Sequence, residues 1–141
     1  MVSVRIISRF SSGFSVDKLN PGNRKIAGDG LYPSDELLEI LKHSETVSLM
    51  TRDAAKDVKR LGIKEEGVAV LLRQALKVGQ YTGSEWASIN EKTCAACDVY
   101  RLQRTETVEE TGYECSVEYY LKFAIGKTGQ IVMVISCHLS Q

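Results

Sequence analysis

The C-terminal part of the chain carries side chains of the types that can transfer protons and bind phosphate. In the segment 117–125, polar and apolar residues alternate, so Tyr120 and Lys122 share one face of a predicted strand. In the segment 131–139, the same alternation places His138 on the polar face. We expect the two segments to form a hairpin with one polar cluster. Its members are Glu118, Tyr120, Lys122, Ser136 and His138.

This cluster contains the groups that metal-free RNA cleavage requires. When the 2′-hydroxyl of RNA attacks its own phosphate, a base accepts the 2′ proton, a cation stabilises the phosphorane and an acid protonates the 5′-oxygen. His138 can act as acid or base near neutral pH. Lys122 supplies positive charge, and Tyr120 can orient a phosphate or stack on a base. We predict Tyr120, Lys122 and His138 as catalytic residues, with no metal and no cofactor.

Basic residues nearby are candidates for binding phosphate. Arg101 can hold a phosphate through two parallel hydrogen bonds, and we add Lys92 and Arg104 as phosphate-binding residues. A second basic group near the N-terminus could extend an RNA-binding surface or belong to a solvated terminus. Its members are Arg5, Arg9, Lys18, Arg24 and Lys25.

The register of the predicted hairpin should keep the apolar faces of its strands together. This rule pairs Ile125 with Ile131 and places Glu118 opposite His138. In that position the carboxylate of Glu118 would stabilise the protonated imidazole of His138.

Periodicity predicts the elements that position the cluster. Helices are expected from Ser34, over 51–61 with Gly62 as the stop, and over about 64–79. Strands are expected at 2–7, 46–50, 98–104, 117–125 and 131–139. The segment 105–114 is predicted as an acidic loop, and Trp86 is expected in a loop before the sheet.

Helices followed by strands are typical of the α+β class. The length of 141 residues suits one domain, in which first-half helices pack on a C-terminal antiparallel sheet. We assign that domain to residues 34–141. Residues 1–33 are expected to be a polar, basic extension that adds few apolar side chains to the core, so that its loss would destabilise the fold little.

Composition excludes several classes of protein. Hydrophobic residues make up 43% of the chain, which is ordinary for a globular protein and excludes a disordered or fibrous one. Eighteen basic and eighteen acidic residues cancel, which disfavours a nonspecific nucleic-acid-coating protein. No apolar run approaches the roughly 20 residues of a membrane helix, and the N-terminus lacks a signal-peptide pattern. We expect a cytoplasmic protein without membrane contact.

The pair Cys94 and Cys97 permits a zinc hypothesis. Structural zinc usually requires four ligands in two close pairs, but Cys115 and Cys137 lie singly on separate predicted strands. A reduced, partly buried state is therefore favoured, and a small zinc-dependent regulatory domain is kept as an alternative.

Several short motifs follow one another in an order that resembles the MqsR family, the ribonuclease toxins of bacterial toxin–antitoxin pairs. They are V-S-L-M-T-R-D-A-A at 47–55, L-G-I at 61–63, D-V-Y-R at 98–101, Y-L-K at 120–122 and the final segment 131–136. The resemblance covers roughly residues 34–141. It implies a RelE-like α+β fold, sequence-selective cleavage of mRNA and neutralisation by a cognate antitoxin protein, which the basic N-terminal residues could contact.

The chain also departs from this family pattern. The family has a glutamine where this chain has Cys97, and a lysine where it has His138. A lysine that the family has upstream is missing from this chain. Residues 1–33 of this chain have no counterpart in the family. These departures motivate the alternative of a noncatalytic relative that binds RNA or protein on the same fold.

Overall fold

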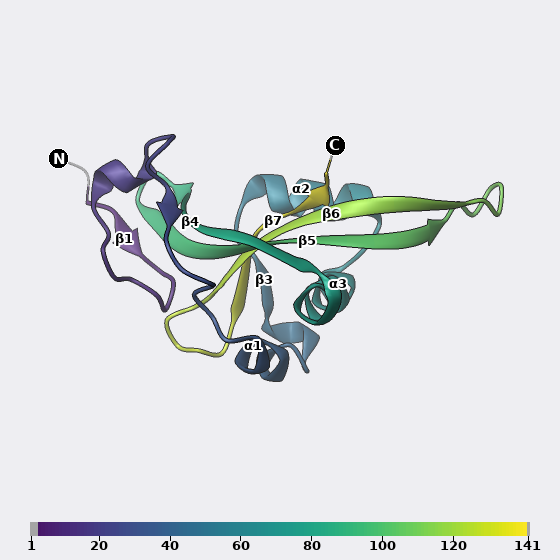
Figure 1. Cartoon of the computed structure of the whole chain (residues 1–141), viewed down its shortest axis with the longest axis horizontal. Helices are drawn as coiled ribbons and strands as arrows, with labels where there is room; N and C mark the ends of the chain where they lie inside the picture. The colour runs from purple at the N-terminus through teal and green to yellow at the C-terminus, as the bar shows by residue number, and fades with distance from the viewer. Residues whose placement is uncertain (1–2, 141) are drawn as a thin grey trace.

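One mixed sheet organises the computed structural model, which describes residues 3–140 (Figure 1). Along the sheet the strand order is β2-β4-β5-β6-β7-β3, and β1 also pairs with β5. Neighbours from β2 to β7 are antiparallel, whereas β3 lies parallel to β7 and β1 parallel to β5. The strands are β1 (Arg5–Ile6), β2 (Lys25–Ile26), β3 (Val47–Leu49), β4 (Gln80–Asn90), β5 (Thr93–Thr107), β6 (Glu114–Ile125) and β7 (Val132–Leu139).

Three α-helices of the described chain pack on this sheet, which confirms the α+β prediction. They are α1 (Ser34–Ile40), α2 (Arg52–Leu61) and α3 (Glu65–Val78). Thr51 caps α2, because its Oγ1 accepts a hydrogen bond of 3.0 Å from the backbone N–H of Ala54. Gly62 ends the helix in the left-handed conformation, as predicted. Helix α2 packs mainly on β7, and α3 packs mainly on β5.

The predicted C-terminal strands are present, but the sheet is larger than the sequence indicated. Strand β4 was missed, and Trp86 lies within it with 2% of its surface exposed. Strand β5 begins at Thr93, earlier than predicted, and the supposed acidic loop shrinks to residues 108–113. The reason is that residues 94–99 are all buried, so the period-two alternation that marks a half-exposed strand is absent there.

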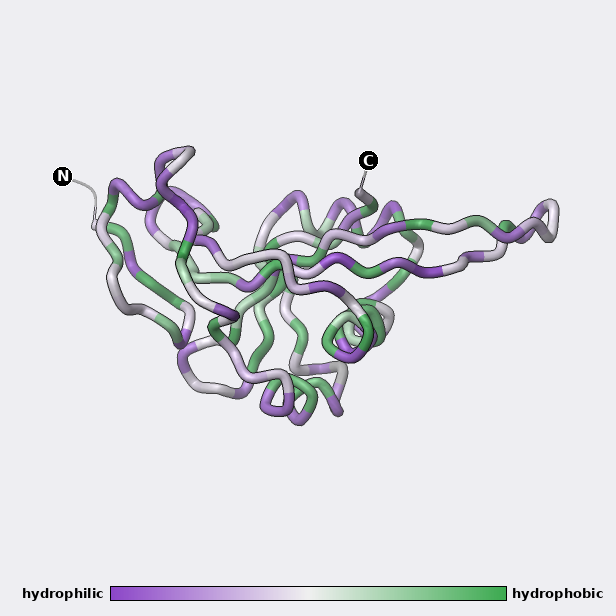
Figure 2. The backbone as a smooth tube through the Cα atoms, viewed as in Figure 1, coloured by the Kyte–Doolittle hydropathy of each residue, from purple (hydrophilic) through white to green (hydrophobic). Residues whose placement is uncertain are grey.

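Beyond the body of the sheet, β5 and β6 continue as a projecting two-stranded arm (Figure 1). The two strands are paired from Asp98, which lies opposite Phe123, to Thr107, which lies opposite Glu114. Hydrophilic residues dominate the turn at the tip, whereas hydrophobic residues are frequent in the central strands and alternate with hydrophilic ones along the helices (Figure 2). The side chains near the tip are exposed, including Tyr113 with 75% of its surface accessible.

The N-terminal segment packs into the fold, so the expectation that it adds little to the core is wrong. Strand β1 continues the sheet beside β5 beyond the end of β6, with Ile6 opposite Cys94; Val2, also predicted as strand, lies outside the described residues. Trp86 is covered by this segment, with ring centroids 4.8 Å from Phe14 and 6.3 Å from Phe10. Its apolar side chains were missed because they are spread among turn-forming residues. They are Val4, Ile6, Phe10, Phe14, Leu19, Ile26 and Leu31.

A buried carboxylate fastens the same segment to the sheet. Asp98 is 1% exposed and accepts hydrogen bonds from the backbone N–H groups of Leu31 (2.9 Å) and Tyr32 (3.2 Å). Ser84 donates a third hydrogen bond of 2.6 Å. Burial raises the pKa of Asp98, although these hydrogen bonds oppose the rise.

None of the helices in the described part of the chain is long and apolar enough to cross a membrane.

Candidate functional site

The ring of Tyr120 lies at the centre of the predicted catalytic cluster. His138 stacks on it, with 5.0 Å between ring centroids and 15° between ring planes. The guanidinium carbon of Arg101 lies 5.3 Å from the centre of the Tyr120 ring, and the amino nitrogen of Lys122 lies 5.9 Å from it. The strand pairings explain this grouping, because Tyr120 is opposite Arg101 on β5 and opposite His138 on β7. The sequence therefore predicted the shared face correctly.

The predicted partner of His138 is wrong. Ile125 pairs with Val132 instead of Ile131, and an irregularity between Lys122 and Phe123 shifts the register by one more residue. Together the two shifts move His138 from Glu118 to Tyr120. Because their sum is two residues, Ser136 and His138 stay on the predicted face with Tyr120 and Lys122. Val132 and Val134 lie where only the first shift applies, so they change to the face of Ile125 and Phe123.

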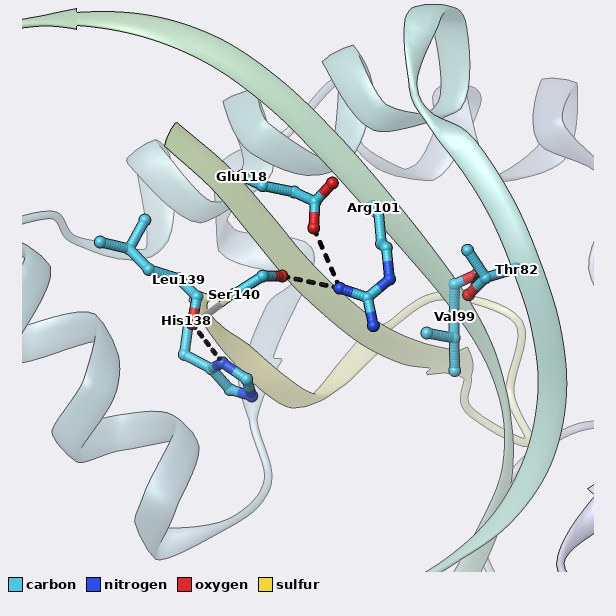
Figure 3. Close-up of polar contacts among 7 residues, drawn as sticks. All are labelled: Thr82, Val99, Arg101, Glu118, His138, Leu139 and Ser140. Carbon is cyan, nitrogen blue, oxygen red and sulfur yellow. Dashed lines mark hydrogen bonds and ion pairs between the residues drawn. The ribbon is translucent and has the colours of Figure 1, made fainter. Parts of the chain in front are cut away.

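Glu118 instead forms an ion pair with Arg101. Its Oε1 lies 3.0 Å from Nη1 of Arg101, and the same nitrogen donates a hydrogen bond of 2.9 Å to the hydroxyl of Ser140 (Figure 3). Both contacts use Nη1, so within residues 3–140 Nε and Nη2 of Arg101 make no hydrogen bond. Because 40% of the Arg101 side chain is exposed, its guanidinium can still donate hydrogen bonds to a phosphate.

Lys122 is held by a carboxylate that the sequence analysis missed. Its Nζ lies 2.9 Å from Oε2 of Glu85 on β4, and only 13% of the Lys122 side chain is exposed. Burial by itself would lower the pKa of Lys122. The hydrogen bond to Glu85 and the nearby Tyr120 outweigh burial, so the pKa lies above its ordinary value. Lys122 is therefore a fixed positive charge at neutral pH and not a proton acceptor.

His138 has one ring nitrogen available for proton transfer. Nδ1 lies 3.0 Å from the backbone oxygen of Leu139, which can only accept a hydrogen bond (Figure 3). Nδ1 therefore donates its hydrogen there, and Nε2 is left to exchange protons. The residue also lines a cavity of about 490 Å³ together with Asp57 and Arg60 of α2.

Two smaller cavities lie on either side of Arg101. One of about 250 Å³ is lined by Arg101 and Tyr120 together with residues of β2 and β4, including Lys25 and Glu85. The other, of about 300 Å³, is lined by Arg101, Gln103, Glu118 and the start of β4. Arg101 thus separates two polar hollows on the face that carries Tyr120.

The structure does not bring the other two predicted phosphate ligands to this site. Lys92 lies in the turn before β5, nine residues from Arg101, which corresponds to about 30 Å along an extended strand. Arg104 is three residues after Arg101 on the same strand and therefore points to the opposite face, where it pairs with Glu106 at 3.2 Å.

The two closely spaced cysteines also lie on opposite faces of β5, as their spacing of three residues requires. Cys94 packs in the Trp86 cluster, whereas Cys97 packs in the main core. Burial raises the pKa of both thiols. Two sulfurs on opposite faces cannot bind one ion while the strand is intact, which argues against the zinc alternative.

Glu85 and Lys25 belong to the two strands that were not predicted. The sequence analysis missed Glu85 and named Lys25 only as one of the basic residues near the N-terminus. Glu85 directly precedes Trp86. A charged residue followed by one aromatic residue is only a weak indication of a strand. Lys25 directly precedes Ile26 within a segment of turn-forming residues.

In comparison with known proteins, no family model, no curated protein and no solved structure matches this chain.

Proposed function

We propose that the protein is the toxin of a bacterial type II toxin–antitoxin system, a cytoplasmic endoribonuclease that cleaves mRNA without a metal ion. The observation that carries this proposal is the grouping of His138, Arg101 and Lys122 around the ring of Tyr120. It supplies a proton-transfer group, two cations and an aromatic surface on one face of a sheet. The ordered motifs that resemble the MqsR family support the same assignment and suggest an antitoxin partner.

In the proposed reaction, the 2′-oxygen of the substrate forms a bond to phosphorus and the bond from phosphorus to the 5′-oxygen breaks. Nε2 of His138 transfers one of the two protons, either accepting it from the 2′-hydroxyl or donating it to the leaving 5′-oxygen, and solvent water exchanges the other proton. Arg101 and Lys122 stabilise the negative charge that develops on the phosphorane oxygens. The ring of Tyr120 keeps the imidazole oriented through stacking and offers a surface next to the substrate base.

One observation favours a noncatalytic RNA- or protein-binding relative as the second candidate. Both cations at the site already have carboxylate partners, since Arg101 pairs with Glu118 and Lys122 pairs with Glu85. Cys97, at the position of the family's glutamine, is fully buried and cannot reach a substrate. A binding module would keep the same charged face without transferring a proton.

Inducible expression in a bacterial host tests the proposal. We expect growth arrest and new RNA 5′ ends at a recurring short sequence, and we expect purified protein to cleave the same sites in the presence of EDTA. The His138→Ala protein is the control for contaminating nucleases, because it should purify identically and cleave far less. Normal growth with intact transcripts, combined with RNA binding by the purified protein, would establish the noncatalytic candidate instead.

A further inference from the structure

We infer that Lys25 of the N-terminal segment binds an RNA phosphate together with Arg101, in the cavity of about 250 Å³ beside Tyr120. This inference rests on the proposed function and adds a substrate contact to it. Lys25 is one of the five basic residues near the N-terminus, and it lines this cavity together with Tyr120 of the predicted catalytic cluster and with Arg101.

The pairing of β2 with β4 fixes the place of Lys25. Lys25 lies opposite Glu85 in this antiparallel pair, and Ile26 lies opposite Ser84. A hydrogen bond of 2.8 Å from the backbone N–H of Trp86 to the oxygen of Arg24 extends the pairing. Because Ile26 packs in the Trp86 cluster, alternation places Lys25 on the other face of the sheet, the face of Glu85.

The charges around the cavity favour an anion. Glu85 is the carboxylate nearest to Lys25 in the strand pairing, but its Oε2 is already bound to Lys122 at 2.9 Å. Within residues 3–140, no carboxylate lies within ion-pair distance of the Lys25 amino group. Lys25 therefore contributes an uncompensated positive charge, and Arg101 retains Nε and Nη2 for the same ligand.

A phosphodiester fits this cavity better than a carboxylate ligand or a neutral one. The two cations that line this cavity can contact different oxygens of one phosphate, or two neighbouring phosphates of an extended strand. The ring of Tyr120 in the same lining suits a base adjacent to that phosphate. Single-stranded RNA thus has a matching group for each of Lys25, Arg101 and Tyr120.

The test measures binding separately from cleavage. A short fluorescent single-stranded RNA with 2′-O-methyl groups cannot be cleaved, because the nucleophile is blocked. Its affinity is measured across a series of salt concentrations for the wild type, Lys25→Ala and Lys25→Arg. Lys18→Ala is the matched control, because it removes the same charge from the same segment but from a residue that does not line this cavity.

We expect Lys25→Ala to weaken binding roughly tenfold at low salt and to reduce the slope of log affinity against log salt by about 0.7. Lys25→Arg should retain most of the affinity, and Lys18→Ala should resemble the wild type. Equal losses for Lys18→Ala and Lys25→Ala, or no loss for either, would overturn the inference while leaving the proposed function intact. Failure of the wild type to bind or cleave RNA would instead reject both together.

Discussion

His138 lies directly opposite Tyr120 in the β6–β7 pairing, and their rings stack with 5.0 Å between centroids. The stacking orients the imidazole from one side, while its Nδ1 donates to the backbone oxygen of Leu139. Two independent contacts therefore fix the direction of Nε2. A proton-transfer group that is held in this way needs no further carboxylate to orient it.

Replacement of His138 should separate activity from folding. We expect His138→Ala to reduce the rate of RNA cleavage by about 10²–10⁴-fold with little change in the melting temperature, because the residue lies near the free end of β7. Single-turnover cleavage of a labelled RNA measures the effect. His43→Ala is the control, because it removes the other histidine, which is exposed after α1. Full activity in a folded His138→Ala protein would remove this residue from the mechanism.

Substitutions of Tyr120 should distinguish the ring from the hydroxyl. Within residues 3–140 the Tyr120 hydroxyl makes no hydrogen bond, whereas the ring contacts His138 and Arg101. We expect Tyr120→Phe to lose less than about tenfold in cleavage rate, because stacking is preserved. Tyr120→Ala should lose substantially more. Equal losses in the two variants would show that the hydroxyl contacts the substrate phosphate.

The pair of Lys122 and Glu85 should contribute to stability as well as to the site. Glu85→Gln leaves the largely buried ammonium group of Lys122 without its counter-charge. We expect the free energy of unfolding to fall by about 1–2 kcal/mol, less than for a fully buried pair. Urea denaturation of Glu85→Gln, Lys122→Met and the double variant completes a thermodynamic cycle. Additive effects in that cycle would mean that the contact of 2.9 Å is energetically neutral.

Asp98 should impose a distinct pH dependence on stability. Because its pKa is raised in the folded protein, the folded state binds more protons than the unfolded state just above the ordinary value of 3.8. The contribution of Asp98 to the free energy of unfolding is therefore largest below that value and falls as the pH rises through the raised pKa. Denaturation of the wild type and Asp98→Asn across this range isolates the effect. The difference between the two proteins should change with pH in this direction; a constant difference would contradict it.

The cover over Trp86 can be tested through its fluorescence, since the chain has a single tryptophan. We expect Phe14→Ala to shift the emission to longer wavelength and to lower the free energy of unfolding by about 1–3 kcal/mol. Val16→Ala is the control on the same segment, because Val16 is 60% exposed. Unchanged emission in Phe14→Ala would indicate that the segment does not shield the indole in solution.

The sequence predicted the elements that have one buried and one exposed face. Helices α2 and α3 show this periodicity, as does the face shared by Tyr120, Lys122 and His138. The prediction from periodicity failed for the first part of β5, where both faces are buried and the alternation disappears. It also failed for the partner of His138, because the loop length and the irregularity beside Lys122 determine the register and leave no signature in the hydrophobic pattern.

Two site residues could not be placed at the site from the sequence for a different reason. Lys25 reaches the site only through the pairing of β2 with β4, which joins segments far apart in the sequence, and Glu85 reaches it through the pairing of β4 with β5. Strands of two residues, such as β2, have too few positions to show any period. Their contribution becomes visible only when the three-dimensional arrangement is known.

The place of the N-terminal segment has a consequence for synthesis of the protein. Ser8, which accepts a hydrogen bond from the backbone N–H of Ala96, is separated from it by 88 residues, and Ser8 also pairs with Gly126. Residues 5–8 therefore cannot make these contacts until residues 92–126 have been translated. During that time the apolar side chains of this segment stay exposed to solvent. The segment therefore joins the sheet only late in synthesis, after its partners on β5 and Gly126 have been made.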